Sequence, residues 1–374
     1  MIYLDNAATT QPLPDVLKKA EKFNGECFFN PSALYRGGLD NNKEISEARE
    51  FILKSLGADA KEFECVFTSC GSESDNQAIF SCAKRGIAVT TAGEHAAVHR
   101  SFAELKNRGV ETRFVSLEKN GAVNTRELLE IVAGGNVRFV SVIHVNNETG
   151  AVNDVNFLAD AVKKIDKKIV FHSDGVQAYG KVPFRLSPNI DLYSVSAHKI
   201  NALKGTGALI KRKNLALTPL IYGGGQEYGL RSGTENVFGI KAFEYAAQEK
   251  YENLETYCEK VRGLNERMRN ALDGELFDFI SDEKCSPYIL SLSAKGVKGE
   301  VVMHMLEEFG VIVGNGSACS SKNRFSRVIE ACGRKNDDGV IRISFNPYLT
   351  EFEVLFAAEK LNECAAKLAK IIKK

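Results

Sequence analysis

The chain has 374 residues, more than one compact core of ordinary size holds, so its length predicts a large domain with a smaller companion. Lys and Arg number 49 and Asp and Glu number 48, a net charge of +1 that gives no electrostatic case for a dedicated nucleic-acid or membrane-binding protein. The first residues, MIYLDNAATT, contain no basic, apolar leader, and the longest apolar runs, such as VRFVSVIHV (137–145), are less than half a membrane span. We therefore expect a cytoplasmic protein.

The nine cysteines indicate reduced thiols rather than disulfides or a metal site. Their number is odd, and no two of them form a CxxC pair. Because the spacing fits neither a zinc site nor a secreted disulfide framework, we expect no bound metal.

Between about residue 60 and residue 215, short β-branched runs alternate with helical patterns. A helix is expected over 73–85, and the capping-box spacing of Asn124 and Glu127 opens another over 124–132. Strands are expected at 63–67, 86–91, 112–117, 137–145, 168–174, 191–199 and 207–212. This alternation implies an α/β domain with a mostly parallel sheet covered by helices on both faces, and ligands collect at the carboxyl ends of such strands.

A charged amphipathic pattern over 241–274 predicts one long helix that leaves this domain. The rest resembles a small α+β unit, with elements expected at 288–296, 300–314, 340–345 and 351–374. We therefore expect a large α/β domain over 14–250 and a small α+β domain formed by 1–13 and 251–374.

Polar side chains follow several of the expected strands, where the strand ends meet at one edge of the sheet. The turn at Gly71-Ser72 opens a helix, and backbone N–H groups at a helix N-terminus suit a phosphate. The other strand-end residues are a pair of amides, a carboxylate with an amide three residues on, and a hydroxyl, imidazole and amine in one short run: Asn146, Asn147, Asp174, Gln177, Ser196, His198 and Lys199.

Each of these residues has an ordinary explanation when taken alone. Asp174 could cap a helix, His95 could be a packed imidazole, and Lys199 could be a solvated lysine. Together they supply what pyridoxal 5′-phosphate (PLP) requires: a lysine for the imine, a carboxylate facing the pyridine nitrogen, a phosphate cradle and an aromatic cover. The combination is far less probable by chance than any single residue.

A series of motifs in order along almost the whole chain resembles cysteine desulfurases of the group I, NifS/IscS-like kind. They are YLDNAATT (3–10), NPSALYRGG (30–38), FTSCGSESDNQAI (67–79), GEHAAV (93–98), HVNNETG (144–150), HSDGVQAYGK (172–181), SAHKI (196–200), KGTGALI (204–210), RSGTENV (231–237), GSAC (316–319) and IRIS (341–344). The resemblance implies the class V aminotransferase branch of the fold type I, PLP-dependent transferases, and a homodimer.

Carried over position by position, the resemblance implies roles around the cofactor ring. Lys199 would be the Schiff-base lysine, and Asp174 would face the pyridine nitrogen. His95 would stack on the ring and take part in catalysis. Asn147 and Gln177 would lie near the phenolic oxygen and the substrate.

The resemblance also implies how the phosphate and the substrate are held. Thr234 would reach the phosphate from the other subunit, and Arg342 would anchor the substrate carboxylate with its bidentate fork. The other phosphate-binding residues would be Gly71, Ser72, Ser196 and His198.

The stretch GNGSACSS (314–321) surrounds one cysteine with small, polar residues that offer neither apolar cover nor a fixed backbone. By resemblance, Cys319 accepts the sulfur of L-cysteine as a persulfide and L-alanine is released. The sulfur would pass to an acceptor protein, either an iron–sulfur scaffold or a tRNA-thiolating enzyme. The alternatives are a selenocysteine lyase and a catalytically idle paralogue that binds partners in sulfur trafficking.

The sequence departs from the family pattern at several places. Ser72 replaces a common Thr and keeps the hydroxyl, whereas Cys70 replaces a common Gly and could be a packed residue or an auxiliary thiol. Tyr35 stands where relatives carry His, a departure at the expected substrate entrance. The chain also ends soon after its last helix, without the longer tail that housekeeping members use to meet their scaffold partner.

Overall fold

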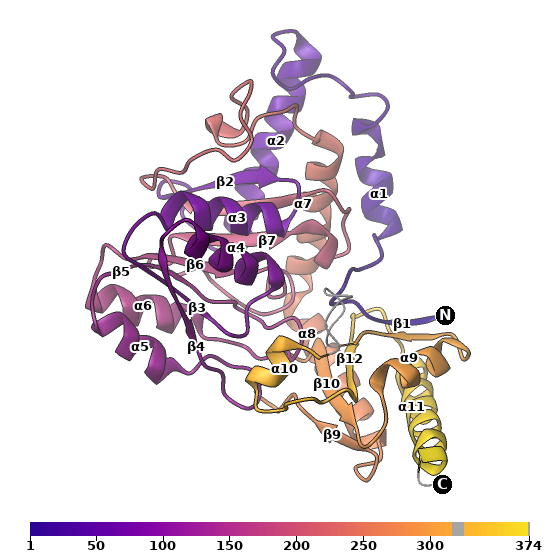
Figure 1. Ribbon diagram of the computed structural model, residues 1–374. Helices are drawn as coiled ribbons and strands as arrows, with labels where there is room; N and C mark the ends of the chain where they lie inside the picture. Colours follow the sequence, from indigo (N-terminus) through magenta and orange to yellow (C-terminus); the bar gives the residue numbers. More distant parts are fainter. Residues whose placement is uncertain (316–324, 373–374) are drawn as a thin grey trace.

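The computed structural model describes residues 1–315 and 325–372. The N-terminal two thirds of the chain build a seven-stranded sheet of order β2-β8-β7-β6-β5-β3-β4 (Figure 1). Its strands are β2 (Phe63–Thr68), β3 (Ile87–Thr91), β4 (Glu111–Val115), β5 (Val137–Ser141), β6 (Val170–Asp174), β7 (Leu192–Ser196) and β8 (Gly207–Arg212). Only β8 runs antiparallel to its neighbours in this sheet, which confirms the mostly parallel sheet predicted from the sequence.

Helices cover both faces of this sheet, because its strands alternate their apolar side chains between two cores. In β3, Ile87 and Val89 point into one core, whereas Ala88 points into the other. The helices are α1 (Pro14–Ala20), α2 (Arg36–Ser55), α3 (Gly71–Cys82), α4 (Ala96–Asn107), α5 (Thr125–Ala133), α6 (Val155–Ile165) and α7 (Val237–Glu252). Helices α3 and α4 pack on one face, and the others pack on the opposite face (Figure 1).

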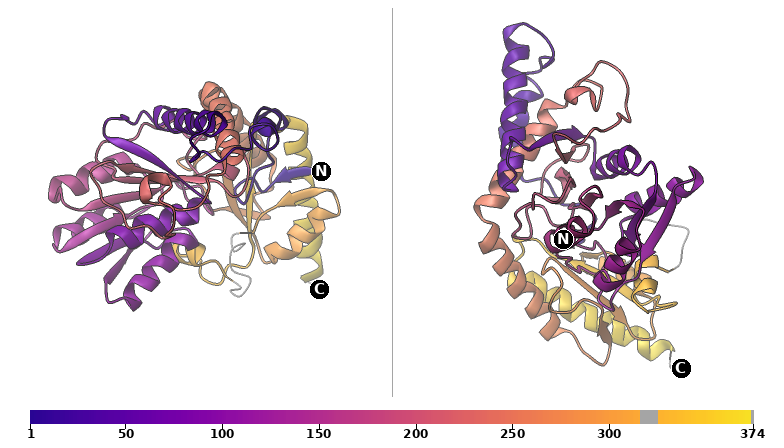
Figure 2. Two further views of the ribbon diagram at one scale, coloured as in Figure 1. Left: turned by 90° about the horizontal axis from the view of Figure 1, so that it is seen from above. Right: turned by 90° about the vertical axis from the view of Figure 1, so that its left-hand side faces the viewer.

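A second apolar core lies between a three-stranded antiparallel sheet, a two-stranded parallel sheet and three helices. The elements of this part are β1 (Ile2–Leu4), α8 (Leu254–Ala271), β9 (Phe277–Phe279), β10 (Ile289–Ala294), α9 (Gly299–Glu307), β11 (Val311–Val313), α10 (Arg327–Ala331), β12 (Val340–Ser344) and α11 (Glu351–Ile372). Strand β1 pairs with β11, so the N-terminal residues join a core otherwise built from the C-terminal third. Figure 2 shows α2 and α11 at opposite ends of the molecule.

The single long helix predicted over 241–274 is wrong, because the structure has two helices that meet at Asn253. The Asn253 backbone leaves helical geometry (φ −120°, ψ 14°), and its side-chain Nδ2 donates to the Glu249 carbonyl at 3.0 Å. Helix α7 buries Phe243 in the first core, whereas α8 buries Val261 in the second. The break therefore lies where the chain passes from one core to the other.

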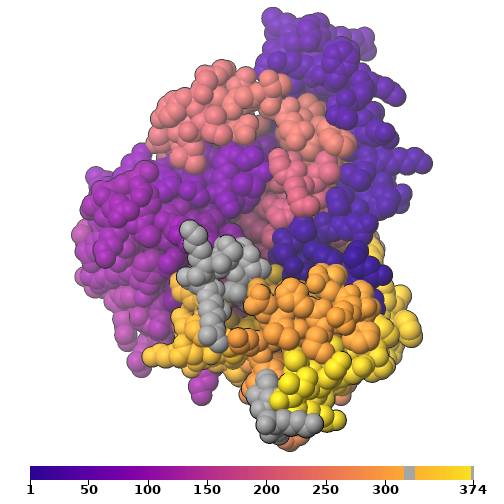
Figure 3. Space-filling view, turned by 45° about the vertical axis from the view of Figure 1, so that its right-hand side comes forward, coloured from indigo at the N-terminus to yellow at the C-terminus, as the bar shows by residue number. Residues whose placement is uncertain are grey.

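The N-terminal segment runs between the two parts and contacts both. In Figure 3 the darkest indigo residues lie directly above the orange surface and below the pink one. Thr10 donates its backbone N–H to His198 of the first part at 3.0 Å, and Ala7 donates its own to the Ser344 hydroxyl of the second at 2.9 Å. No helix among the residues that the structure describes is long and apolar enough to cross a bilayer.

Candidate active site

A cavity of about 510 Å³ opens at the carboxyl ends of the central strands, between the two parts of the molecule. Among the sequence-predicted residues, those that line it are Gly71, Ser72, His95, Asn147, Asp174, Gln177, Ser196, His198, Lys199 and Arg342. Thr234 is exposed and is not part of the cavity lining. Cys319 lies outside the described residues.

One wall of the cavity is the N-terminal end of α3. Cys70 precedes this helix without a side-chain cap, so backbone N–H groups there face the cavity. A Cβ added at Gly71 would lie 2.7 Å from Val176 Cγ2, which means that only glycine allows the helix to approach this closely. The Ser196 hydroxyl is buried on the same wall and has no partner among the described residues. Unpaired donors at a helix N-terminus suit a phosphate.

The floor of the cavity carries the carboxylate of Asp174, at the end of β6. Its side chain is buried, and Oδ1 accepts a hydrogen bond from the Val176 N–H at 2.9 Å. Burial raises the pKa of this carboxyl to about 6, and the Val176 hydrogen bond and Lys199 oppose that rise. A cationic ring nitrogen placed over this carboxylate would restore its charge.

Two further buried carboxyls line the cavity, and sequence reasoning did not identify them. Asp75 lies one helical turn after Gly71, and Glu94 directly precedes His95. Burial, reinforced by Asp174, raises the pKa of Asp75, and burial raises the pKa of Glu94 to about 8. The spacing of Asp75 from the helix start could have placed it on the cavity face of α3.

His95 lines the same cavity as Asp174 and caps α4. Its Nδ1 accepts from the Ala97 N–H at 3.2 Å. Burial, together with the positive charge of Lys199, lowers the pKa of His95 to about 4. The imidazole is therefore neutral near pH 7 and can cover an aromatic ring without adding charge.

Lys199 follows β7 in the short 3-10 helix η2 (Ala197–Lys199) and reaches the N-terminal segment. Its Nζ donates to the carbonyls of Ala7 at 2.7 Å and Ala8 at 2.8 Å. Gln177 Nε2 donates to the same Ala7 carbonyl at 2.8 Å, and Gln177 Oε1 accepts from Lys181 Nζ at 2.9 Å. These backbone contacts were not predicted from the sequence, because a carbonyl carries no residue-type signal.

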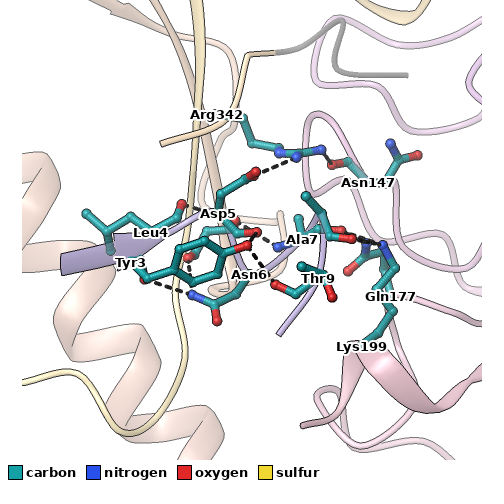
Figure 4. Close-up of polar contacts among 12 residues, drawn as sticks. Tyr3, Leu4, Asp5, Asn6, Ala7, Thr9, Asn147, Gln177, Lys199 and Arg342 are labelled. Carbon is teal, nitrogen blue, oxygen red and sulfur yellow. Dashed lines mark hydrogen bonds and ion pairs between the residues drawn. The ribbon is translucent and has the colours of Figure 1, made fainter. Parts of the chain in front are cut away.

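Arg342 lies in β12 on the opposite side of the cavity (Figure 4). Nη1 donates to the Asn147 carbonyl and Nη2 to Asp5 Oδ1, each at 2.8 Å. The Arg342 Nε and the Asn147 side-chain oxygen are buried and have no partner among the described residues. Nη1 and Nη2 each have a second N–H, with which the guanidinium could bind a carboxylate in the cavity.

PLP fits the residues that the cavity provides. The unpaired Ser196 hydroxyl and the α3 N-terminus could hold the phosphate, and the buried Asp174 carboxylate could face the ring nitrogen. Lys199 provides an amine and His95 a neutral ring in the same cavity. Among the described residues, no group of three or more His, Cys, Asp or Glu side chains could hold a metal ion.

Most of the described cysteines are buried thiols. Burial raises the pKa of Cys65, Cys82 and Cys285 to about 12 and that of Cys332 to about 11. Cys70 differs, because it lines the cavity. Tyr35, the other departure from the family pattern, is an exposed residue that precedes α2 and does not line the cavity.

The sequence matches the family described as "Aminotransferase class-V" over residues 2–355. The chain belongs to this family. The "Cysteine desulfurase" of Nostoc sp. (strain PCC 7120 / SAG 25.82 / UTEX 2576) is 35% identical over 380 aligned positions, which cover 98% of this chain and 94% of the relative. The "Putative cysteine desulfurase IscS 1" of Bacillus subtilis (strain 168) is 34% identical, covering 98% and 99% of the two chains.

Solved structures of similar proteins have the same fold. One named "NIFS-LIKE PROTEIN" superposes with a TM-score of 0.91 at 33% identity, covering 98% of this chain and all of that one. Another, "SspA in complex with cysteine", superposes with a TM-score of 0.82 at 29% identity, covering 94% of this chain and all of that one. The predicted resemblance to cysteine desulfurases and the predicted fold class are confirmed.

Proposed function

We propose that this protein is a PLP-dependent cysteine desulfurase that converts L-cysteine to L-alanine in the cytoplasm. The observation that carries the proposal is the meeting of Lys199, Asp174, His95 and Arg342 in one cavity. Relatives named cysteine desulfurase at about 35% identity over nearly the whole chain support the same activity.

PLP supplies an electron sink for the bonds at the substrate Cα. Asp174 would hold a proton on the ring nitrogen through its charge, and His95 would cover the ring. Lys199 Nζ would move the proton at Cα, since it reaches the cavity from the end of β7. Arg342 would orient the substrate carboxylate through the terminal N–H donors that Asn147 and Asp5 leave unused.

The sulfur would move to Cys319. The substrate Cβ–S bond breaks, a new S–S bond forms between the substrate sulfur and Cys319, and Cβ receives a proton to complete L-alanine. The raised pKa values of the buried cysteines make those thiols poor nucleophiles, which supports a thiol elsewhere in the chain. Cys70 is the rival, because it lines the cavity.

The direct test is to incubate purified protein with PLP and L-cysteine, with dithiothreitol as reductant, and to assay L-alanine and sulfide. Without reductant, mass spectrometry should find one extra sulfur on the peptide that contains Cys319. Sulfur on the Cys70 peptide, or full turnover by Cys319→Ser, would contradict the assignment of the acceptor. Absence of alanine would contradict the activity itself, and a higher rate with L-selenocysteine would favour the lyase.

The persulfide would then supply an iron–sulfur scaffold or a tRNA-thiolating enzyme. Both kinds of acceptor require delivery of sulfur at the oxidation level that a persulfide carries. Transfer of ³⁵S from labelled cysteine to each candidate acceptor would distinguish them.

A further inference from the structure

The ion pair between Asp5 and Arg342 links the N-terminal segment to the side chain proposed to anchor the substrate. Asp5 Oδ1 lies 2.8 Å from Arg342 Nη2, and the two side chains are 18% and 5% exposed. The Asn147 carbonyl accepts from Nη1 at 2.8 Å, so two fixed acceptors set the guanidinium plane. Figure 4 shows Asp5 and Asn147 on different sides of this group.

These two contacts leave part of the guanidinium available. The group has five N–H donors, of which one on Nη1 and one on Nη2 are used by Asn147 and Asp5. Arg342 Nε is buried and has no partner among the described residues. Arg342 therefore keeps donors for one carboxylate, in a direction set by Asp5 and Asn147.

Gly314 makes room for this ion pair. It pairs with the Arg342 backbone through hydrogen bonds of 2.9 Å and 2.7 Å. A Cβ added at Gly314 would lie 2.4 Å from Asp5 Oδ1 and 3.0 Å from Arg342 Nη2. Any larger residue at 314 must displace one of the two partners, so the backbone here is shaped around the pair.

The same N-terminal segment also fixes Lys199. Ala7 and Ala8, two and three residues after Asp5, accept from Lys199 Nζ at 2.7 Å and 2.8 Å. One short stretch of backbone therefore sets the positions of both the carboxylate anchor and the amine (Figure 4).

We propose that Asp5 is a positioning residue for substrate binding, which orients the Arg342 guanidinium so that its N–H groups donate to the carboxylate of the amino acid. This inference rests on the proposed function. Asp5 acts through Arg342 and is not part of the cavity lining.

Asp5 has two opposing effects on a bound carboxylate. Its hydrogen bond fixes the guanidinium, which saves the cost of ordering a long side chain on binding. Its negative charge repels the incoming carboxylate, although the Arg342 cation lies next to it. Without Asp5, the terminal nitrogens of Arg342 would keep one described contact, with the Asn147 carbonyl. We therefore infer that the affinity gained by orienting the guanidinium exceeds the affinity lost to the repulsion.

The test compares L-alanine with ethylamine, which lacks only the carboxylate, by following the absorbance of the bound cofactor during titration of the PLP-loaded protein. Asp5→Ala should weaken L-alanine binding about tenfold, the value of one charge-assisted hydrogen bond, and should change ethylamine binding less than about twofold. Asp5→Asn keeps an acceptor oxygen and loses the repulsion, so its affinity for L-alanine should equal or exceed that of the wild type.

Two further variants are compared with Asp5→Ala: Gly314→Ala as a second disturbance of the ion pair and Asp15→Ala as a control for charge. Gly314→Ala disturbs the ion pair while keeping both partners, so it should reproduce the selective loss for L-alanine. Asp15→Ala removes an equal charge from an exposed position on α1 and should change neither affinity. Apoprotein melting temperatures would show whether each variant is folded.

The outcomes separate this inference from the proposed function. If the wild type shows no preference for L-alanine over ethylamine, the carboxylate anchor at Arg342 is wrong and the role of Asp5 fails with it, whereas the desulfurase activity is judged separately by the release of L-alanine from L-cysteine. If the wild type prefers L-alanine and Asp5→Ala keeps that preference or strengthens it, only the role of Asp5 is overturned. An equal loss for both ligands would show a general structural role and would also overturn it.

Discussion

Asp174 places a carboxylate in a cavity floor where burial disfavours its charge. The pKa of this carboxyl rises from 3.8 to about 6 in the folded chain, so its contribution to stability is full below pH 3.8 and is lost as the pH rises through 6. At pH 7.5 the ionised group therefore destabilises the apoprotein. This cost is consistent with a residue retained for its charge rather than for the fold.

We predict that Asp174→Asn stabilises the apoprotein by roughly 3 kcal/mol at pH 7.5 and by about half as much at pH 5. The same change should lower turnover of L-cysteine by about a hundredfold or more, because preorganised charge at the ring nitrogen is lost. Urea unfolding of both apoproteins at the two pH values, with alanine release by the PLP-loaded forms, measures both effects. Near-normal turnover, or a stability difference that does not change with pH, would contradict the prediction.

Most of the predicted site residues line one cavity because their positions follow from strand topology. Asp174 and Lys199 come at the ends of neighbouring parallel segments, so their convergence could be predicted before the structure. Glu94 was not predicted, since its burial depends on the packing around the turn before α4. The hydrogen bond from Lys199 Nζ to the Ala7 carbonyl was also not predictable, because any residue type can supply a backbone acceptor. The pairing of Asp5 with Arg342 depends on a contact 337 positions apart in the chain.

At the scale of single elements, α3 depends on a close approach at its first residue. A Cβ at position 71 would lie only 2.7 Å from Val176 Cγ2, and Val176 also lines the cavity. We predict that Gly71→Ala lowers PLP affinity about tenfold or more by moving the helix N-terminus away from the phosphate. Pyridoxal, which has no phosphate, should lose much less affinity.

Gly263→Ala is the matched control for this prediction. Gly263 lies within α8, and an added Cβ would meet no atom within 4 Å. The variant should gain up to about 1 kcal/mol in unfolding free energy through helix propensity and keep its PLP affinity. Equal affinity losses for PLP and pyridoxal in Gly71→Ala would show that the helix N-terminus does not bind the phosphate.

The boundary between α7 and α8 was not predicted from the hydrophobic pattern of the sequence. The amphipathic pattern continues through Asn253 because both helices bury one face, so periodicity alone predicted a single helix. The break exists because the two faces belong to different cores. Periodicity reports that a face is buried and does not report which core buries it.

At the scale of the whole molecule, the two apolar cores support a division into two domains. We propose that the boundary falls near Asn253, close to the expected position after residue 250, and that residues 1–13 belong with the C-terminal domain. The packing of Leu4 in the second core supports that grouping. Limited proteolysis at the α7–α8 junction would test it.

The loop that carries Thr234 is fixed to its own subunit while Thr234 itself stays outside the cavity lining. Glu227 accepts from Arg49 at 2.5 Å through both carboxylate oxygens and from the Phe67 N–H at 2.8 Å, and Gln77 donates to the Leu230 carbonyl at 2.8 Å. A loop anchored in this way cannot swing Thr234 into its own site without breaking buried contacts. We therefore propose that Thr234 completes the site of a second subunit in a homodimer.

Mixing two defective variants tests this assignment directly. Thr234→Val should reduce PLP affinity about tenfold by removing one hydroxyl donor to the phosphate, and Lys199→Ala should be unable to bond the cofactor. In a mixed dimer, the Thr234→Val subunit supplies Lys199 and its partner supplies an intact Thr234, so one complete site is formed. At limiting PLP, borohydride should therefore trap more cofactor on the Lys199 peptide when excess Lys199→Ala protein is allowed to exchange with Thr234→Val protein. If mixing leaves the trapped fraction unchanged although mass spectrometry detects mixed dimers, Thr234 acts within its own chain, and an active monomer in sedimentation would contradict the dimer itself.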